Sequence, residues 1–248
     1  MVRYGLLGFP LVHSFSRQFF TEKFRQEDIN AEYLNFEIEH IDLLATILQE
    51  YPDLKGLNVT IPYKEKVIPY LDELSDDAQS IGAVNCIQIT ARHGKPYLKG
   101  YNADVIGFVR SIKPLLRSNH TKALILGTGG ASKAVRYGLE KIGLQSCFVS
   151  RTLRDGMLSY EQLTPDIMHE YTVIINCTPV GTFPKTDECP GIPYDYVTSE
   201  HLLYDLIYNP DKTLFLQRGE QHGATIKNGL EMLHLQALAS WAFWHESI

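Results

Sequence analysis

The feature that most constrains this chain is a glycine-rich turn between an apolar strand-like run and a helix-like run. Residues 123–126 read Ala-Leu-Ile-Leu, and they are followed by Gly127-Thr128-Gly129-Gly130-Ala131-Ser132. A helical stretch then continues to Gly143, and a second apolar run ends at Val149. Strand, glycine turn, helix and strand in this order predict a βαβ unit that binds a dinucleotide, because glycines let the backbone approach a pyrophosphate at the helix N-terminus.

The residues after the second strand indicate which dinucleotide is bound. An NAD enzyme usually places an acid here, which bonds the ribose 2′-hydroxyl and repels a 2′-phosphate. This chain has Arg151, with Arg154 three residues later, and a guanidinium pairs with phosphate. We therefore predict a Rossmann-type domain that prefers NADP. The usual third glycine is replaced by Ser132, so a turn that only lets a helix pack on a strand is the alternative.

Length and charge limit the classes of protein. The chain has 248 residues, 44% of them hydrophobic, and a formal net charge of −6. That length allows one large or two modest domains, and the negative charge argues against a nucleic-acid partner. The sequence carries no basic-plus-apolar leader and no apolar run of membrane-spanning length. We expect a soluble, cytoplasmic protein with no membrane partner.

The cysteines predict neither a metal site nor disulfides. Cys86, Cys147, Cys177 and Cys189 form no C-x-x-C pair and have no accompanying histidine cluster. Reduced thiols in a cytosolic protein are the expected state.

Hydrophobic periodicity favours an α/β fold in two parts. Strands are expected at 3–7, 31–38, 56–60, 84–89, 96–99, 123–126, 147–149, 172–176, 202–206 and 224–227, and helices at 16–26, 41–51, 104–116, 213–222 and 229–244, besides the one that ends at 143. We place a domain boundary near residue 103. By their number and spacing, most of the large apolar residues of the last helix are expected in the core; they are Leu230, Leu233, Leu235, Leu238, Trp241 and Phe243.

Five polar clusters lie beside expected strand ends or turns, where sites of α/β proteins concentrate. They are His13-Ser14-Phe15-Ser16, Asn58-Val59-Thr60-Ile61-Pro62-Tyr63-Lys64, Gly82-Ala83-Val84-Asn85, Gly100-Tyr101-Asn102-Ala103-Asp104 and Asn176-Cys177-Thr178-Pro179-Val180-Gly181. In this order, and together with the glycine turn, they resemble the shikimate dehydrogenase family. The resemblance continues through residues 205–210 and 229–233 to Gln236.

The resemblance implies a fold and a reaction. It implies an N-terminal α/β substrate domain over 1–103, to which a C-terminal helix (230–248) returns, and a Rossmann-type NADP-binding domain over 104–229. The implied reaction is the reversible reduction of 3-dehydroshikimate to shikimate with NADPH, in the biosynthesis of chorismate and aromatic amino acids. A monomer or a homodimer is expected.

The resemblance also implies roles for individual residues. Lys64 and Asp104 are the catalytic pair. Substrate is bound by Ser14 and Ser16, which take its carboxylate, and by Thr60, Asn85, Tyr208 and Gln236. The cofactor is bound by Asp76, Gly127, Gly129, Gly130, Ala131, Ser150, Arg151, Thr152, Arg154, Leu206, Gly229 and Met232.

These residue types suit the implied chemistry. Hydride reduction of a ketone creates an alkoxide, which a lysine ammonium can stabilise and protonate while a carboxylate orients it. Taken singly, Lys64 is more often a solvated charge, and Asp104 a helix N-cap. The family pattern also has exceptions here, since Arg17, Ala103 and Ser150 stand where Pro, Thr and Asn are usual.

Two other functions remain open at this point. One is a related enzyme that also oxidises quinate, with NAD, against which Arg151 and Arg154 argue. The other, from a different class, is a non-catalytic dinucleotide-binding sensor, which loss of Lys64 or Asp104 would have indicated. Both residues are present.

Overall fold

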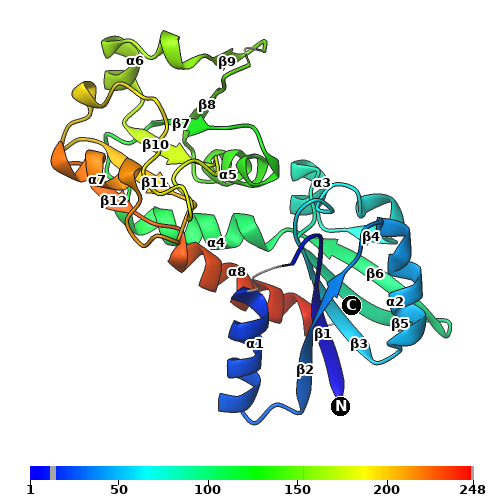
Figure 1. Cartoon of the computed structure of the whole chain (residues 1–248). Helices are drawn as coiled ribbons and strands as arrows, with labels where there is room; N and C mark the ends of the chain where they lie inside the picture. The colour runs from blue at the N-terminus through cyan, green and yellow to red at the C-terminus, as the bar shows by residue number, and fades with distance from the viewer. Residues whose placement is uncertain (12–14, 153, 247–248) are drawn as a thin grey trace. The chain divides into compact units, whose positions relative to one another are not determined.

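The computed structural model describes residues 1–11, 15–152 and 154–246 (Figure 1). The chain forms two compact units, Met1–Ala103 with Ala237–Ile248 and Asp104–Gln236. Each unit is built around its own six-stranded sheet. Among the described residues, no helix combines the length and apolar character needed to cross a membrane.

The first unit has a mixed sheet with the strand order β2-β1-β3-β5-β6-β4. Its strands are β1 (Val2–Gly8), β2 (Ala31–Glu37), β3 (Leu54–Val59), β4 (Glu73–Leu74), β5 (Cys86–Arg92) and β6 (Lys95–Tyr101). Strands β2, β1 and β3 run parallel, whereas β5 is antiparallel to both β3 and β6. The start of β5 and the end of β6 therefore lie at the same edge of the sheet as the end of β3, with Cys86 opposite Asn58 and Tyr101.

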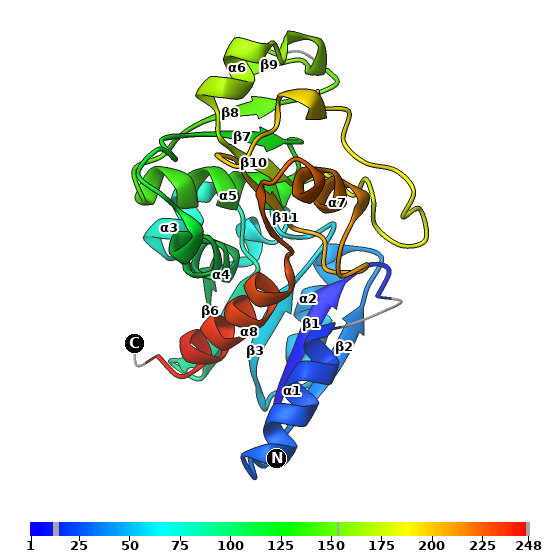
Figure 2. The ribbon, with the colours of Figure 1, turned by 90° about the vertical axis from the view of Figure 1, so that its left-hand side faces the viewer.

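Helices cover both faces of this sheet. They are α1 (Phe15–Gln26), α2 (Leu44–Glu50) and α3 (Asp76–Ile81), with short 3-10 turns at Ile41–Leu43 and Ile68–Tyr70. Figures 1 and 2 show α1 and α2 on opposite faces. An aliphatic core that includes Leu44 and Leu57 lies on the α2 side. On the other side Phe20 of α1 stacks on Tyr33, with ring centroids 4.9 Å apart.

The second unit has a fully parallel sheet with the order β12-β11-β10-β7-β8-β9. Its strands are β7 (Lys122–Leu126), β8 (Gln145–Val149), β9 (Met157–Leu158), β10 (Val173–Asn176), β11 (Leu202–Asp205) and β12 (Thr225–Lys227). The strand order reverses between β7 and β10. In such sheets the crevice beyond the carboxyl ends of the two central strands is the usual ligand site.

Helices cover the second sheet on both sides, as parallel strands require. They are α4 (Ala103–Ile112), α5 (Gly130–Lys141), α6 (Pro165–Glu170), α7 (Leu214–Gln221) and the start of α8 (Leu230–Trp244), with 3-10 turns at Lys113–Leu115, Tyr160–Gln162 and Tyr194–Tyr196. Successive residues of β7 point to opposite cores: Ile125 packs with Phe108 of α4, and Leu124 packs with Phe215 of α7. The predicted α/β class with a Rossmann-type domain is confirmed.

Helix α8 differs from the expectation in two ways. Its residues 230–236 group with the second unit, whereas we expected all of 230–248 to join the first. The expected burial of its leucines was wrong for Leu230 and Leu238, which are exposed. Three of the six buried residues of α8 have small side chains, Ala237, Ala239 and Ser240, which let the helix lie close to its neighbours.

Candidate functional site

In the first unit, two of the predicted substrate-binding residues, Thr60 and Asn85, lie at the edge where β1 and β3 end and β5 begins. Thr60 directly follows β3, and its N–H donates to the carbonyl of Leu7 on β1 (2.9 Å). Asn85 directly precedes β5, and its carbonyl accepts the N–H of Val59 (2.8 Å). The topology thus brings together two motifs that lie 25 residues apart in the sequence.

The side-chain amide of Asn85 uses its oxygen in a hydrogen bond within the protein. The side chain is buried, and its Oδ1 accepts the N–H of Ala103 (2.6 Å). The loop before it is tied by Asn102, whose Nδ2 donates to the carbonyl of Ala83 (2.9 Å). This leaves the NH₂ group of Asn85 as the donor that a ligand hydroxyl can use.

Lys64 lies in the turn that follows Pro62. Its side chain is half-buried, and its carbonyl accepts the N–H of Val84 (2.7 Å), which ties the turn to the loop that leads to Asn85. The preceding Tyr63 is buried, and its hydroxyl donates to the carbonyl of Ile38 (2.6 Å). The backbone that carries the ammonium is therefore fixed on two sides.

Ser16 is the second residue of α1, close to the positive end of the helix dipole, which favours an anion. Its hydroxyl is hydrogen-bonded to Tyr33 of β2. The Tyr33 hydroxyl in turn donates to Oδ1 of Asn58 (2.8 Å), and Nδ2 of Asn58 donates to Oγ of Ser240 (2.8 Å). The other predicted carboxylate ligand, Ser14, lies outside the described residues.

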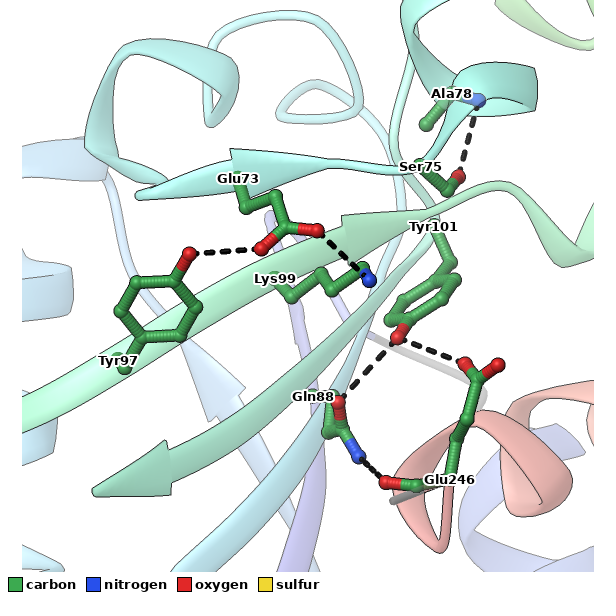
Figure 3. Close-up of polar contacts among 8 residues, drawn as sticks. All are labelled: Glu73, Ser75, Ala78, Gln88, Tyr97, Lys99, Tyr101 and Glu246. Carbon is green, nitrogen blue, oxygen red and sulfur yellow. Dashed lines mark hydrogen bonds and ion pairs between the residues drawn. The ribbon is translucent and has the colours of Figure 1, made fainter. Parts of the chain in front are cut away.

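Asp76 begins helix α3 and is exposed. The preceding Ser75 caps this helix, because its Oγ accepts the N–H of Ala78 (3.2 Å). Figure 3 shows this cap beside the contacts that fix the neighbouring strands, where Glu73 pairs with Lys99 (2.8 Å) and Tyr101 donates to Glu246 (2.9 Å). Asp76 is thus placed by a capped helix and has no role in the core.

In the second unit, the glycine turn lies at the reversal of strand order. Gly127 follows β7 with a φ of +96°, and an added Cβ would lie 2.8 Å from Cγ2 of Thr178, which comes just after β10. Gly129 and Gly130 instead face open space at the start of α5. The first N–H groups of a helix have no helical acceptor, so they can bind an anion here.

Ser132 stands where the usual motif has its third glycine, and its side chain fits within the packing. Its side chain is fully buried, and its hydroxyl donates to the carbonyl of Gly129 (2.6 Å). Glycine is needed further along α5 instead, because an added Cβ at Gly138 would lie 2.9 Å from the ring of Phe108 on α4.

Arg151 and Arg154 follow β8 and are exposed. Neither forms an ion pair with another described residue. Ser150 shapes this loop, because its Oγ accepts the N–H of Thr152 (3.2 Å). Two unneutralised guanidinium groups beside the C-terminal end of β8 suit a 2′-phosphate.

Leu206, Gly229 and Met232 lie together, as a common ligand contact requires. An added Cβ at Gly229 would lie 2.1 Å from the carbonyl oxygen of Leu206, so only glycine fits. The N–H of Gly229 donates to the carbonyl of Ile207 (3.0 Å). Met232 lies one turn into α8 and is buried.

Asp205 anchors this segment, and sequence reasoning assigned it no role. Its carboxylate accepts from Oγ1 of Thr213 (2.6 Å), Nδ2 of Asn176 (3.0 Å) and the N–H of Ile207 (3.0 Å). Burial raises the pKa of Asp205 to about 6, although these hydrogen bonds act in the opposite direction. Tyr208 follows on the exposed loop.

Asp104 and Gln236 lie on two helices that pack closely. Both side chains are largely buried. Asp104 is one turn before Gly107 on α4, where an added Cβ would lie 3.0 Å from Cβ and N of Gln236 on α8. These two residues and Tyr208 belong to the second unit, so their pairing with Lys64 and Asn85 stays a prediction.

Three supporting residues of the first unit were also missed. Asn58 stands inside a motif that we had singled out, yet only its burial next to Asn85 reveals its position. Tyr33 and Ser240 carry no signal in the sequence beyond an ordinary core pattern. No group of three or more His, Cys, Asp or Glu side chains among the described residues could hold a metal ion.

Sequence comparison with known proteins points to one family. A family profile for the "Shikimate dehydrogenase substrate binding domain" matches residues 6–87. "Shikimate dehydrogenase (NADP(+))" of Aquifex aeolicus is 37% identical over 253 residues, which cover 98% of this chain and 90% of the relative. The protein of that name from Carboxydothermus hydrogenoformans is 36% identical over 97% of this chain and 90% of its own length.

Solved structures agree. The shikimate 5-dehydrogenase of Thermus thermophilus, in complex with NADP(H) and shikimate, has a TM-score of 0.85 and 28% identity, and the alignment covers 99% of this chain and 94% of that one. The shikimate 5-dehydrogenase of Listeria monocytogenes, in complex with shikimate and NAD, also has a TM-score of 0.85, with 27% identity over 100% of this chain and 93% of that one.

Proposed function

The chain belongs to the shikimate dehydrogenase family, and we propose that it is an NADP-dependent oxidoreductase that interconverts 3-dehydroshikimate and shikimate. The observation that carries this function is the match, over nearly the whole chain, to relatives named for that activity. The proposed role is a step in the biosynthesis of chorismate and aromatic amino acids.

The residues of the second unit fit the cofactor. The pyrophosphate would lie against Gly127, Gly129, Gly130 and Ala131, where open space adjoins the N-terminus of α5. Arg151 and Arg154, with Ser150 and Thr152, would hold the 2′-phosphate. Leu206, Gly229 and Met232 would flank the nicotinamide, and Asp76 would approach the cofactor from its own helix. Bound NADPH supplies the hydride.

The chain's own groups would bind the substrate and move the proton. Ser14 and Ser16 would take the carboxylate, while Thr60, Asn85, Tyr208 and Gln236 would hold ring hydroxyls. The ammonium of Lys64 would stabilise the negative charge that grows on the carbonyl oxygen and donate a proton to it. Asp104 would orient that ammonium and accept a hydrogen bond from a substrate hydroxyl.

Arg151 and Arg154 favour NADP over NAD, and the presence of Lys64 and Asp104 favours catalysis over a sensor role. A cytoplasmic location is also proposed, since all four cysteines are free thiols, which suits a reducing compartment. Monomer or homodimer remains the expectation for its assembly.

Initial rates with shikimate and quinate, each with NADP and with NAD, test the function directly. Shikimate with NADP should give the highest kcat/KM, by at least roughly tenfold over each other pair, the discrimination that one charge-assisted contact supplies. A higher kcat/KM for quinate would replace the proposed substrate. No reduction of either nucleotide would leave the sensor role.

A further inference from the structure

A buried line of hydroxyl and amide groups runs behind the proposed carboxylate site of the first unit. It passes from Ser16 on α1 to Tyr33 on β2, then to Asn58 on β3 and Ser240 on α8. Tyr33, Asn58 and Ser240 are all almost completely buried. Only Ser16, at the end of the line, is partly open to a ligand.

The line has a direction. Tyr33 donates its proton to Oδ1 of Asn58, so Ser16 is the donor in its bond to Tyr33. In this sense the single hydroxyl proton of Ser16 is engaged within the protein. A serine that binds a carboxylate must direct this proton at the ligand instead.

The same groups can bond in the opposite sense. The amide of Asn58 has an oxygen and a nitrogen of nearly equal size, and a half-turn exchanges them. Its nitrogen would then donate to Tyr33, and its oxygen would accept from Ser240. The half-turn gives up the long bond from Nδ2 to the carbonyl of Asn85 (3.4 Å), and that carbonyl still accepts the N–H of Val59 (2.8 Å).

We propose that Tyr33, backed by Asn58 and Ser240, is a positioning residue that acts through Ser16 on the substrate carboxylate. This inference rests on the proposed function. When the carboxylate is present, Ser16 turns its proton toward it, Tyr33 donates to Oγ of Ser16, and Asn58 donates to Tyr33. The charge-assisted bond at the ligand end favours this sense.

Two features of Tyr33 suit the role. Burial holds the pKa of its hydroxyl well above the usual range, so it remains a neutral donor and does not repel an anion. Its ring is stacked on Phe20 with an interplanar angle of 11° and also contacts Trp244. The ring contacts fix the position of the hydroxyl, and a phenylalanine would keep them.

The test is Tyr33→Phe, with Tyr4→Phe as the matched control. Tyr4 is equally buried in the same aromatic cluster, where it stacks on Trp244, and its hydroxyl contacts His245 rather than the line. Tyr33→Phe should raise the KM for shikimate about threefold to tenfold, within the range for a hydrogen bond between uncharged groups, because Tyr33 acts on the carboxylate only through Ser16. Its kcat and its KM for NADP should stay within about twofold. Tyr4→Phe should leave all three within that margin.

A double-mutant cycle separates action through Ser16 from a general structural role. In a Ser16→Ala background, Tyr33→Phe should change the KM for shikimate by less than about twofold, because the group it positions is gone. Shikimate methyl ester, which lacks the anionic carboxylate, should likewise show no KM difference between Tyr33→Phe and wild type. A full effect in either experiment would overturn the inference, and so would an unchanged KM for shikimate in Tyr33→Phe.

Folding is checked by circular dichroism. Should Tyr33→Phe not fold, Ser240→Ala removes the far end of the line with a smaller change, and it should raise the same KM about twofold to fivefold. An unchanged KM in Ser240→Ala would then overturn the inference. A wild-type protein that does not oxidise shikimate with NADP would contradict the proposed function itself. Additive effects of Ser16→Ala and Tyr33→Phe in an active enzyme would contradict only the positioning role of Tyr33.

Discussion

The two units present their ligand-binding groups in different ways. At the edge of the first sheet these groups are side chains, held either by a bond of their own, as Asn85 is by the N–H of Ala103, or through their backbone, as Lys64 is by the N–H of Val84. At the crevice of the second sheet the groups at the start of α5 are main-chain N–H groups, exposed where Gly129 and Gly130 leave open space. The side-chain site suits a small substrate with many hydroxyls, and the backbone site suits a phosphate, which every N–H can bind.

This difference sets what a substitution can do. A side chain in the first unit can be removed while the backbone stays in place, so the loss should appear in catalysis or substrate binding. A glycine in the second unit cannot gain a side chain without either moving the backbone or filling the ligand's space. Each of the following predictions tests one side of this comparison.

The largest effect is expected from Lys64→Ala. A general acid typically contributes about 10²–10⁴-fold, and its interaction is strongest in the transition state. We expect kcat to fall by that order while the KM for shikimate stays within about tenfold. Steady-state kinetics on protein checked by circular dichroism measures both values. Lys66→Ala is the control, since Lys66 is exposed two residues away; near-normal kcat in Lys64→Ala would show that the lysine is only a surface charge.

The next largest effect concerns Asp205, a side chain that supports the backbone of the second unit. Its pKa is raised to about 6 by burial, above the value of 3.8 for an ordinary carboxyl. The folded state therefore binds its proton more tightly, and this contribution to stability is present below about pH 4 and lost as the pH rises through 6. The two pKa values correspond to about 3 kcal/mol.

Urea denaturation from pH 4 to pH 7 measures this contribution as a difference between proteins. Asp205→Asn cannot titrate, so the free energy of unfolding of wild type minus that of the variant should fall by about 2 kcal/mol between pH 4 and pH 7. Asp195→Asn, which alters an exposed acid of the same unit, controls for the loss of a carboxyl. If the difference in free energy of unfolding between wild type and Asp205→Asn did not change with pH, the pKa of Asp205 would be the same in the folded and unfolded states. The three donors in the fold would then stabilise the carboxylate as much as water does.

Arg151 is the side-chain part of the otherwise main-chain cofactor site. A charge-assisted contact is worth about 1.5–3 kcal/mol, so Arg151→Ala should raise the KM for NADP at least ~tenfold. The kinetics with NAD, which lacks the 2′-phosphate, should barely change. Arg110→Ala, an exposed arginine on α4, should alter neither. Equal losses with both nucleotides would place Arg151 somewhere other than the 2′-phosphate.

The sequence predicted the second site more directly than the first. The role of a glycine in a turn follows from its immediate neighbours in the sequence. The turn after β7 and the arginine after β8 could therefore be interpreted from residues 123–151 alone. The side-chain site could be assigned only through family resemblance. Its supporting groups were out of reach, because Tyr33 on β2 and Asn58 on β3 meet across β1, and this requires the strand order and register.

Short elements were the other omission. Strands β4 and β9 have two residues each, and helices α3 and α6 have six. Elements of this length complete too few turns or alternations to show a period. Their ends are instead defined by single caps such as Thr164, whose hydroxyl accepts the N–H of Ile167 at the start of α6 (3.4 Å).

The smallest effects are expected within the glycine turn, where two alanine substitutions should separate folding from binding. Gly127 has a φ of +96° and abuts Thr178, so Gly127→Ala should destabilise the fold by about 1–2 kcal/mol. The expected fall in Tm is about 2–8 °C.

Gly129 has a φ of −75° and faces open space, so Gly129→Ala should leave the Tm within about 1 °C. Its added methyl group instead occupies the approach to the pyrophosphate. We expect the KM for NADP to rise roughly threefold to tenfold, equivalent to about 0.6–1.4 kcal/mol. Thermal melts give the Tm of both variants, and steady-state kinetics give their KM for NADP. A destabilised Gly129→Ala with an unchanged KM for NADP would mean that this glycine serves the packing of α5, and the second unit would then hold its cofactor by side chains, as the first holds its substrate.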